Sequence, residues 1–208
     1  MRKKKSVSVF LTAFLIICSV LCFSIDAKAL SIYAGLASGS SRYGIKAYIL
    51  APSAYPNVSS SGESAWVSTN KNSSGKWIQA GVRYYSGYSN MKTYVETYIN
   101  GIYTMNEVGI HLLTANIDYK VSYNTSSSVW NAYIAGNSWA SSTEVGGTIP
   151  VQAHGEVHQS GIQMGPFAFS QVQVQQYPGS WVTPSGTLHA TSPYHYSGTK
   201  TSFTVYGP

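Results

Sequence analysis

Alternation of apolar and polar residues with a period of two is the feature that most constrains how this chain can fold. Segments rich in Val, Ile, Tyr, Thr and Trp show this period, and clusters of Gly, Pro, Asn and Ser separate them. Side chains alternate between the two faces of a strand, whereas an apolar helix face recurs every 3.6 residues. Many short strands at regular spacing predict an all-β fold, either a sandwich or a barrel. The predicted strands are 43–50, 64–68, 77–84, 91–99, 117–123, 129–135, 167–174 and 202–206.

The segments between these strands are also informative. Asn100-Gly101 predicts a tight hairpin turn, because both residues tolerate the positive φ that a two-residue loop requires. Residues 108–112 are the one place where a short helical turn is expected, and residues 31–41 are expected to be a loose entry segment of small residues. Neither an internal repeat nor a linker divides the chain, so the sequence predicts one folded domain.

The first 29 residues have the pattern of a secretory signal peptide. Arginine and lysines come first, an apolar stretch follows over 7–23, and Ala27-Lys28-Ala29 has the small-x-small form of a cleavage site. The expected product is a secreted, extracellular protein with a single β-sandwich domain over residues 30–208. No membrane association is expected after cleavage.

Composition excludes several classes for the predicted mature chain. Both cysteines, Cys18 and Cys22, lie within the signal, and a domain of this size buries roughly 70% of its unfolded surface without disulfides. The net charge of +6 comes largely from the signal; eight basic and six acidic residues remain after it. Without a basic stripe interleaved with aromatic residues, no nucleic-acid partner is expected. A monomer is expected.

Two predicted strands each carry a group suited to amide hydrolysis. The alternation in 77–84 assigns Ile78, Ala80 and Val82 to the core, so Gln79 faces the other side. Glu156 lies in the later strand-like segment 154–158. A carboxylate can take a proton from water, and a primary amide can stabilise the oxyanion that forms when this water attacks a carbonyl.

Aromatic residues on neighbouring predicted strands are expected to surround Gln79 and Glu156. In 91–99 the alternation places Tyr94, Glu96 and Tyr98 on one face. Together with Trp66 of an earlier strand, these side chains are expected to line a concave sheet around Gln79 and Glu156. Aromatic walls of this kind suit an extended ligand.

The order of these motifs resembles that of the glutamic peptidases, or eqolisins. The matching segments are Ser-Ala-Trp-Val at 64–67, Ile-Gln-Ala-Gly at 78–81 and Tyr-Val-Glu-Thr-Tyr at 94–98. The stretch 151–157 is closer to the neprosin group, although neprosins carry a glutamate in place of Gln79.

This resemblance implies a fold and a function. The fold would be a concanavalin-like jelly roll, a sandwich of two curved antiparallel sheets. The function would be that of an endopeptidase without a cofactor that cleaves peptide or protein substrates. Gln79 and Glu156 would be its catalytic dyad, and substrate-binding residues around them would be Trp66, Tyr94, Glu96 and Tyr98. Burial in the groove would raise the pKa of Glu156 and favour an acidic working range, whereas His154 and His158, if charged at low pH, would lower that pKa.

A metal site competes for the same strand. His154, Glu156 and His158 are expected to point to one side, and imidazole and carboxylate groups are ligands of zinc and iron. Positions i and i+4 of a strand lie about 13 Å apart, so one ion would need further ligands, with His111, His189 and His195 as the available histidines. We therefore expect no metal.

A binding module is the second alternative. The chain has 17 tyrosines and five tryptophans, and aromatic rings on a sandwich can stack on sugars. Trp130, Trp139 and Trp181 lie in or near predicted loops and are the candidates. A secreted matrix protein without a site is a third possibility.

Overall fold

A computed structural model describes residues 32–55, 62–158 and 162–208. The predicted signal peptide lies outside these residues. All the regular elements of the described residues are β-strands, which confirms the all-β prediction. No helix in them is long and apolar enough to span a membrane.

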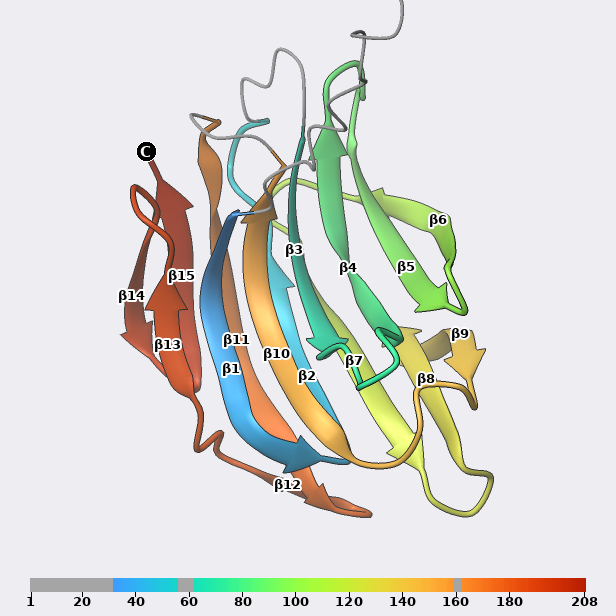
Figure 1. The fold of residues 1–208 in the computed structure, drawn as a ribbon. Helices are drawn as coiled ribbons and strands as arrows, with labels where there is room; N and C mark the ends of the chain where they lie inside the picture. The colour runs from blue at the N-terminus through green and yellow to red at the C-terminus, as the bar shows by residue number, and fades with distance from the viewer. Residues whose placement is uncertain (1–31, 56–61, 159–161) are drawn as a thin grey trace, which may run out of the picture. The chain divides into compact units, whose positions relative to one another are not determined.

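Two antiparallel sheets lie face to face, as Figure 1 shows. The seven-stranded sheet has the order β13-β1-β10-β3-β4-β5-β6, formed by β1 (Ile32–Arg42), β3 (Gly62–Thr69), β4 (Trp77–Tyr85), β5 (Met91–Ile99), β6 (Ile102–His111), β10 (Ile149–Val157) and β13 (Thr187–Ala190). In the eight-stranded sheet the order is β14-β15-β11-β2-β7-β8-β9, and β12 pairs with β11. Its strands are β2 (Gly44–Leu50), β7 (Asn116–Asn124), β8 (Val129–Ile134), β9 (Asn137–Ser142), β11 (Met164–Tyr177), β12 (Ser180–Val182), β14 (His195–Thr199) and β15 (Ser202–Gly207). This is the predicted two-sheet sandwich.

The apolar core fills the space between the two sheets. In β4 every second residue faces it, and Ile78, Ala80 and Val82 are fully buried there. Tyr119 of β7 and Phe167 of β11 belong to the eight-stranded sheet and contribute to the same core. Each large side chain buried in this way contributes roughly 1.5–3 kcal/mol relative to an exposed one. The period of two thus decides which face of each strand joins the core.

All eight predicted strands are present, with small shifts at their ends. The predicted hairpin turn at Asn100 and Gly101 is also present, with φ angles of 52° and 81°, and it joins β5 to β6.

Two sequence predictions about secondary structure are wrong. Residues 31–41 were expected to be loose, yet β1 pairs with both β10 and β13. Small residues suit this place: Gly35 has a φ of +154°, and a Cβ on it would lie 2.2 Å from the carbonyl oxygen of Ala153. Residues 108–112 were expected to contain a helical turn, yet most of them belong to β6. This strand lies at a sheet edge with most of its residues exposed, so it lacks the alternation that marks the other strands.

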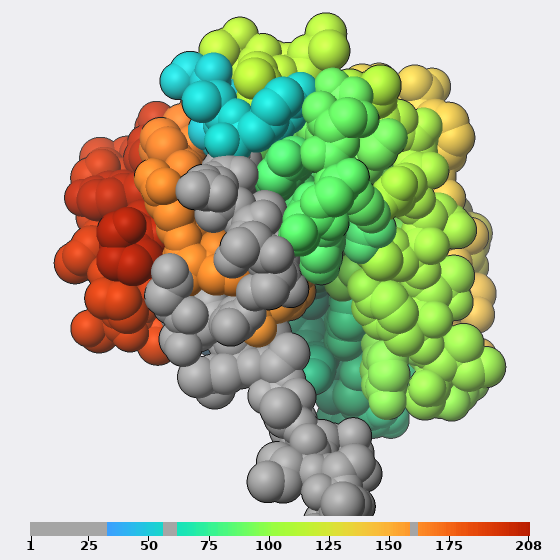
Figure 2. All heavy atoms as spheres, turned by 90° about the horizontal axis from the view of Figure 1, so that it is seen from above, coloured from blue at the N-terminus to red at the C-terminus, as the bar shows by residue number. Residues whose placement is uncertain are grey.

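The segment after β2 covers one end of the sandwich. The Tyr55 ring stacks on Tyr84 at 5.3 Å between centroids, and its hydroxyl donates a hydrogen bond to Asn90 Oδ1 at 2.9 Å. Figure 2 shows this end, where the cyan segment lies beside the green β4–β5 connection. These contacts tie the β2–β3 connection to the seven-stranded sheet.

Candidate functional site

The outer face of the seven-stranded sheet, on the side away from the core, is hollowed into a cleft of about 260 Å³. Side chains from β1, β3, β4, β5, β6 and β10 line it. Five of the six residues predicted to form the site lie in this lining: Trp66, Gln79, Tyr94, Glu96 and Glu156. Tyr98 does not line the cleft. It is half-buried and stacks on Trp77, with 6.4 Å between ring centroids.

Glu156 is held from two sides within the cleft. It is only 8% exposed. The indole Nε1 of Trp66 donates a hydrogen bond to its Oε2 at 2.8 Å, and Nδ1 of His158 lies 3.6 Å from its Oε1. A buried carboxylate requires donors of this kind to remain ionised. The two carboxylate oxygens therefore have different neighbours.

Gln79 is likewise buried, and a partner orients its amide. Its Nε2 donates a hydrogen bond to the Tyr94 hydroxyl at 2.8 Å. Burial raises the pKa of Tyr94 well above its usual value, so this hydroxyl stays protonated. The contact fixes which way the amide points and leaves its second N–H for another acceptor.

Gln79 and Glu156 face the cleft from strands on either side of β3. Glu156 lies opposite Ser64, which lies opposite Arg83, and Gln79 is four residues along β4 from Arg83. Two strand spacings and four residues of rise separate the Cα atoms by about 16 Å. Both side chains stand on the cleft face of the sheet, roughly perpendicular to it, and both line the same cleft.

Glu96 is a second acid in the same cleft. It lies directly opposite Gln79 in the β4–β5 pair. Burial raises its pKa to about 7, and the negative charge of Glu156 adds to this rise. The Tyr103 hydroxyl acts in the other direction by donating a hydrogen bond to Glu96 Oε2 at 2.5 Å. Below pH 7 Glu96 is therefore largely neutral, and the cleft then carries less negative charge around Glu156.

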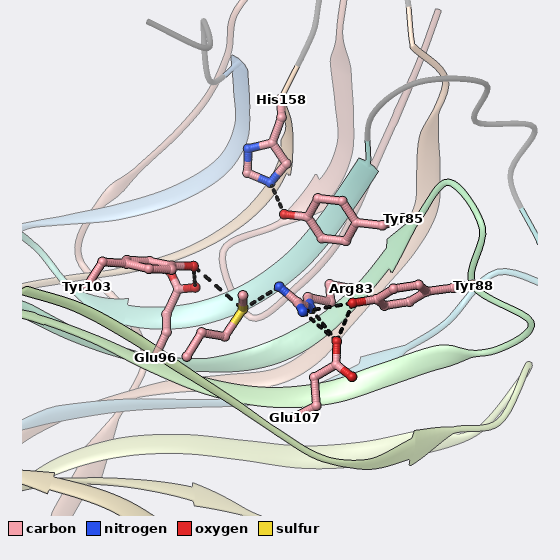
Figure 3. Close-up of polar contacts among 8 residues, drawn as sticks. Arg83, Tyr85, Tyr88, Glu96, Tyr103, Glu107 and His158 are labelled. Atoms are coloured by element: carbon pink, nitrogen blue, oxygen red, sulfur yellow. Dashed lines mark hydrogen bonds and ion pairs between the residues drawn. The ribbon is translucent and has the colours of Figure 1, made fainter.

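An arginine network borders the two acids, and sequence reasoning missed most of it. Arg83 donates from Nε to Glu107 Oε1 at 3.2 Å, and its guanidinium lies 4.9 Å from the centroid of the Tyr85 ring. Tyr88 also donates to Glu107, as the close-up in Figure 3 shows. The alternation in β4 places Arg83 on the same face as Gln79, but its partner Glu107 lies on β6, a strand the sequence did not reveal.

The histidines proposed as metal ligands do not assemble into a ligand set, although His154 and His189 pack against each other. Among the described residues no group of three or more His, Cys, Asp or Glu side chains could hold a metal ion. His154 is buried against the rings of Trp66 and His189, and this burial lowers its pKa to about 3. The Nδ1 atom of His111 pairs with the Tyr119 hydroxyl at 2.8 Å, and His195 belongs to the other sheet.

The tryptophans proposed as a sugar platform do not form one surface. Trp130 is fully buried in β8 and donates to the carbonyl oxygens of Gly146 and Gly147. Its assignment to an exposed platform is wrong. Trp139 is 50% exposed, and half-buried Trp181 lies on β12.

Comparison with known proteins finds similarity of fold. No protein-family model matches the chain, and no curated protein gives a significant match. The structure is similar to a Scytalido-glutamic peptidase bound to a peptide-based transition-state analogue, with a TM-score of 0.62, 17% identity, and coverage of 85% of this chain and 98% of that one. It is also similar to SCP-B, an eqolisin peptidase in complex with the tripeptide Ala-Ile-His, with a TM-score of 0.55, 16% identity and the same coverage. A Bacillus licheniformis β-glucanase is more distant, with a TM-score of 0.42 and 11% identity over 66% of this chain and 68% of that one.

The fold resembles that of the eqolisin peptidases. At 16–17% identity this likeness concerns the arrangement of strands and not the chemistry of the cleft. The likeness to neprosins stays a sequence prediction.

Proposed function

We propose that this chain is a secreted endopeptidase of the glutamic type, which hydrolyses peptide bonds with Gln79 and Glu156. One observation carries the proposal: both side chains are buried in the same cleft, and each is oriented by a hydrogen bond from or to a neighbouring aromatic residue. The fold shared with eqolisin peptidases supports it. The substrate is a peptide or unfolded protein segment, and the enzyme acts as a monomer outside the cell.

The reaction needs one base and one oxyanion donor. Glu156 takes a proton from a water as the water oxygen bonds to the scissile carbonyl carbon. The carbonyl oxygen becomes negatively charged and accepts a hydrogen bond from the Gln79 amide. As the C–N bond breaks, Glu156 returns its proton to the leaving nitrogen, which regenerates the carboxylate and releases an acid and an amine.

The electrostatics of the cleft favour an acidic working range. Glu96 has a pKa of about 7 because it is buried near Glu156. Under acidic conditions Glu96 is protonated and neutral. Glu156 can then be ionised without a second negative charge beside it. Trp66 stabilises this carboxylate through its N–H.

The test uses purified protein and a denatured protein mixture between pH 3 and 7, with peptides read by mass spectrometry. Glu156→Gln should abolish cleavage, and Gln79→Ala should lower kcat/KM by about 10²–10³-fold, the usual effect of losing one oxyanion donor. Glu144→Gln and Gln173→Ala are matched controls, since both residues lie outside the cleft. Circular dichroism checks that every variant is folded.

Two results would count against the proposal. Cleavage that survives Glu156→Gln would show that another group is the base. The absence of cleavage at any pH by the folded wild-type protein would favour a non-catalytic module that only binds peptides or sugars in the cleft.

A further inference from the structure

Two side chains, His158 and Tyr85, form a row of polar contacts that ends on Glu156 and has no part in the mechanism above. His158 follows the last residue of β10, and its Nδ1 lies 3.6 Å from Glu156 Oε1. Its other ring nitrogen, Nε2, lies 2.8 Å from the Tyr85 hydroxyl. The two rings are nearly parallel at 18°, with 5.5 Å between centroids. Figure 3 shows the His158 ring directed at Tyr85.

His158 is anchored but remains open to water. Its backbone N–H donates to the Gly62 carbonyl oxygen at 3.3 Å, which continues the pairing of β10 with β3 by one residue. Its side chain is 27% exposed, whereas that of Glu156 is only 10% exposed. A proton from solvent therefore reaches the imidazole more readily than it reaches the carboxylate.

Tyr85 decides which imidazole nitrogen carries hydrogen. Burial raises the pKa of Tyr85 to about 12, so the hydroxyl keeps its proton and can donate it to Nε2. In the neutral ring the hydrogen then sits on Nδ1, the atom that faces Glu156. When the ring gains a second proton, Nε2–H donates to Tyr85, and Nδ1–H still faces Glu156, now with a positive charge.

We propose that His158 is a positioning residue for the peptidase reaction, and that its protonated form keeps Glu156 ionised and oriented in acid. This inference rests on the proposed function of Glu156. Trp66 donates a hydrogen bond to Oε2, and the imidazolium lies within ion-pair distance of Oε1, so each carboxylate oxygen has a neighbour that favours its negative charge. Tyr85 holds the imidazole in the orientation that this requires.

The other charged groups near His158 leave it as the cation closest to Glu156. Arg83 of β4 is paired with Glu107 of β6, and Glu96 of β5 is largely neutral below pH 7. On β10 itself, His154 stays neutral above about pH 3, and it packs against His189 of β13. The remaining titratable groups that line the cleft are Lys71 of the β3–β4 connection and four tyrosines: Tyr33, Tyr85, Tyr94 and Tyr103.

The pH profile of kcat/KM tests this role. His158→Asn leaves a side-chain amide in place of the imidazole but carries no charge at any pH. The midpoint of the acid limb should shift to a higher pH by about one unit. At pH values below that midpoint, kcat/KM should therefore be about tenfold lower than in the wild type. Near neutral pH the loss should be less than about threefold. Tyr85→Phe keeps the charge and frees the ring, so it should lower kcat/KM without moving the limb.

His195→Asn is the matched control, because His195 lies on β14 in the other sheet. Its profile should coincide with that of the wild type. A second measurement does not require activity: the ring ¹⁵N resonances of His158 should titrate with a lower midpoint in Glu156→Gln than in the wild type, because the facing carboxylate is gone.

The outcomes separate the two proposals. If Glu156→Gln abolishes cleavage but His158→Asn leaves the acid limb unchanged, the role of His158 is overturned and the dyad stands. If Glu156→Gln retains cleavage, the dyad itself is overturned. If the wild type cleaves nothing, the proposed function fails, and an unchanged His158 titration in Glu156→Gln would also overturn the coupling between the two side chains.

Discussion

The outer faces of the two sheets differ in how deeply their polar side chains are buried. On the seven-stranded sheet Gln79, Glu96 and Glu156 are buried in the cleft and bonded to aromatic residues. On the eight-stranded sheet Lys46 and Lys120 are half-exposed, and each lies over an aromatic ring, at 4.9 Å and 3.9 Å from the centroid. Water solvates the second face, whereas on the first face protein groups must replace water as partners.

This difference explains why the polar groups of the cleft have fixed partners, whereas Lys46 and Lys120 do not depend on theirs. Burial shifts the pKa of Glu96 to about 7, and it makes each hydrogen bond in the cleft specific, because an unpaired buried group is costly. The lysines of the other face are held by weaker contacts whose loss water can compensate. Substitutions in the cleft should therefore have larger effects than substitutions on the open face.

Gly81→Ala should have the largest effect on stability. Gly81 lies opposite Trp66 in the β3–β4 pair, and a Cβ on it would lie 2.6 Å from Trp66 Cβ and 2.4 Å from the Ala65 carbonyl oxygen. We expect a loss of about 3 kcal/mol in the free energy of unfolding, typical of severe overpacking, measured by urea denaturation. Gly147→Ala is the control, since no atom lies within 4 Å of a Cβ there. Equal stability of the two variants would show that the cleft floor is not closely packed.

Buried carboxyl groups should make the protein less stable as pH rises above 6.5. Glu63 of β3 accepts a hydrogen bond from the Gly165 N–H at 2.6 Å, and burial raises its pKa to about 8. The unfolded chain has already lost this proton, so the folded state binds more protons between pH 6.5 and 8. The free energy of unfolding should therefore fall by about 2 kcal/mol over that window, measured by thermal or urea denaturation.

Two variants check the source of this pH dependence. Glu63→Gln resembles the protonated acid and should remove most of the slope between pH 6.5 and 8, leaving the smaller part that Glu96 contributes, whereas Glu144→Gln, at an exposed site, should leave the curve unchanged. At the acid end the sign reverses. His154 has a folded pKa of about 3, so the unfolded chain binds this proton between pH 6.5 and 3 and the folded chain does not. Down to pH 4.5 Glu63 and Glu96 outweigh this effect, because only the folded state binds their protons there. Below pH 4.5 the effect of His154 remains, and stability should decline towards pH 3. Stability that rises from pH 6.5 to 8 would contradict the burial of Glu63.

Trp66→Phe should reduce activity while leaving the fold intact. The substitution keeps an aromatic ring and removes the N–H that donates to Glu156 Oε2. We expect kcat/KM to fall about tenfold, equivalent to about 1.4 kcal/mol of transition-state stabilisation. Trp139→Phe, at an exposed position of β9, serves as the control. Unchanged activity in Trp66→Phe would mean that Glu156 does not depend on this donor.

Lys120→Ala should have the smallest effect. It removes a cation–π contact with Tyr133 on the solvated face, which is worth at most about 1 kcal/mol at such a site. Urea denaturation should show a change within that limit, and peptidase activity should be unchanged. A loss of activity would show that the outer face of the eight-stranded sheet takes part in function, which would remove the contrast between the faces.

Strand positions were predictable because they depend on local sequence. Ile78, Ala80 and Val82 alternate with Gln79 and Gly81, and this alternation alone assigned Gln79 to the face opposite the core. The edge strand β6 was not predictable in this way. Its residues are exposed on both faces, so no alternation marks them, and Tyr103 and Glu107 were missed with it.

The sequence by itself determined the all-β class, eight of the strands and the side of each strand that carries the candidate residues, because side-chain alternation follows from backbone geometry within a few residues. Only the tertiary structure decided what those residues contact. The strand order β10-β3-β4-β5 places Trp66 against Glu156, 90 positions away in the sequence. Side chains from these neighbouring strands also bury the polar groups of the cleft. Strand order depends on pairing between distant segments, and burial depends on every element around a residue, so neither can be obtained from the local pattern.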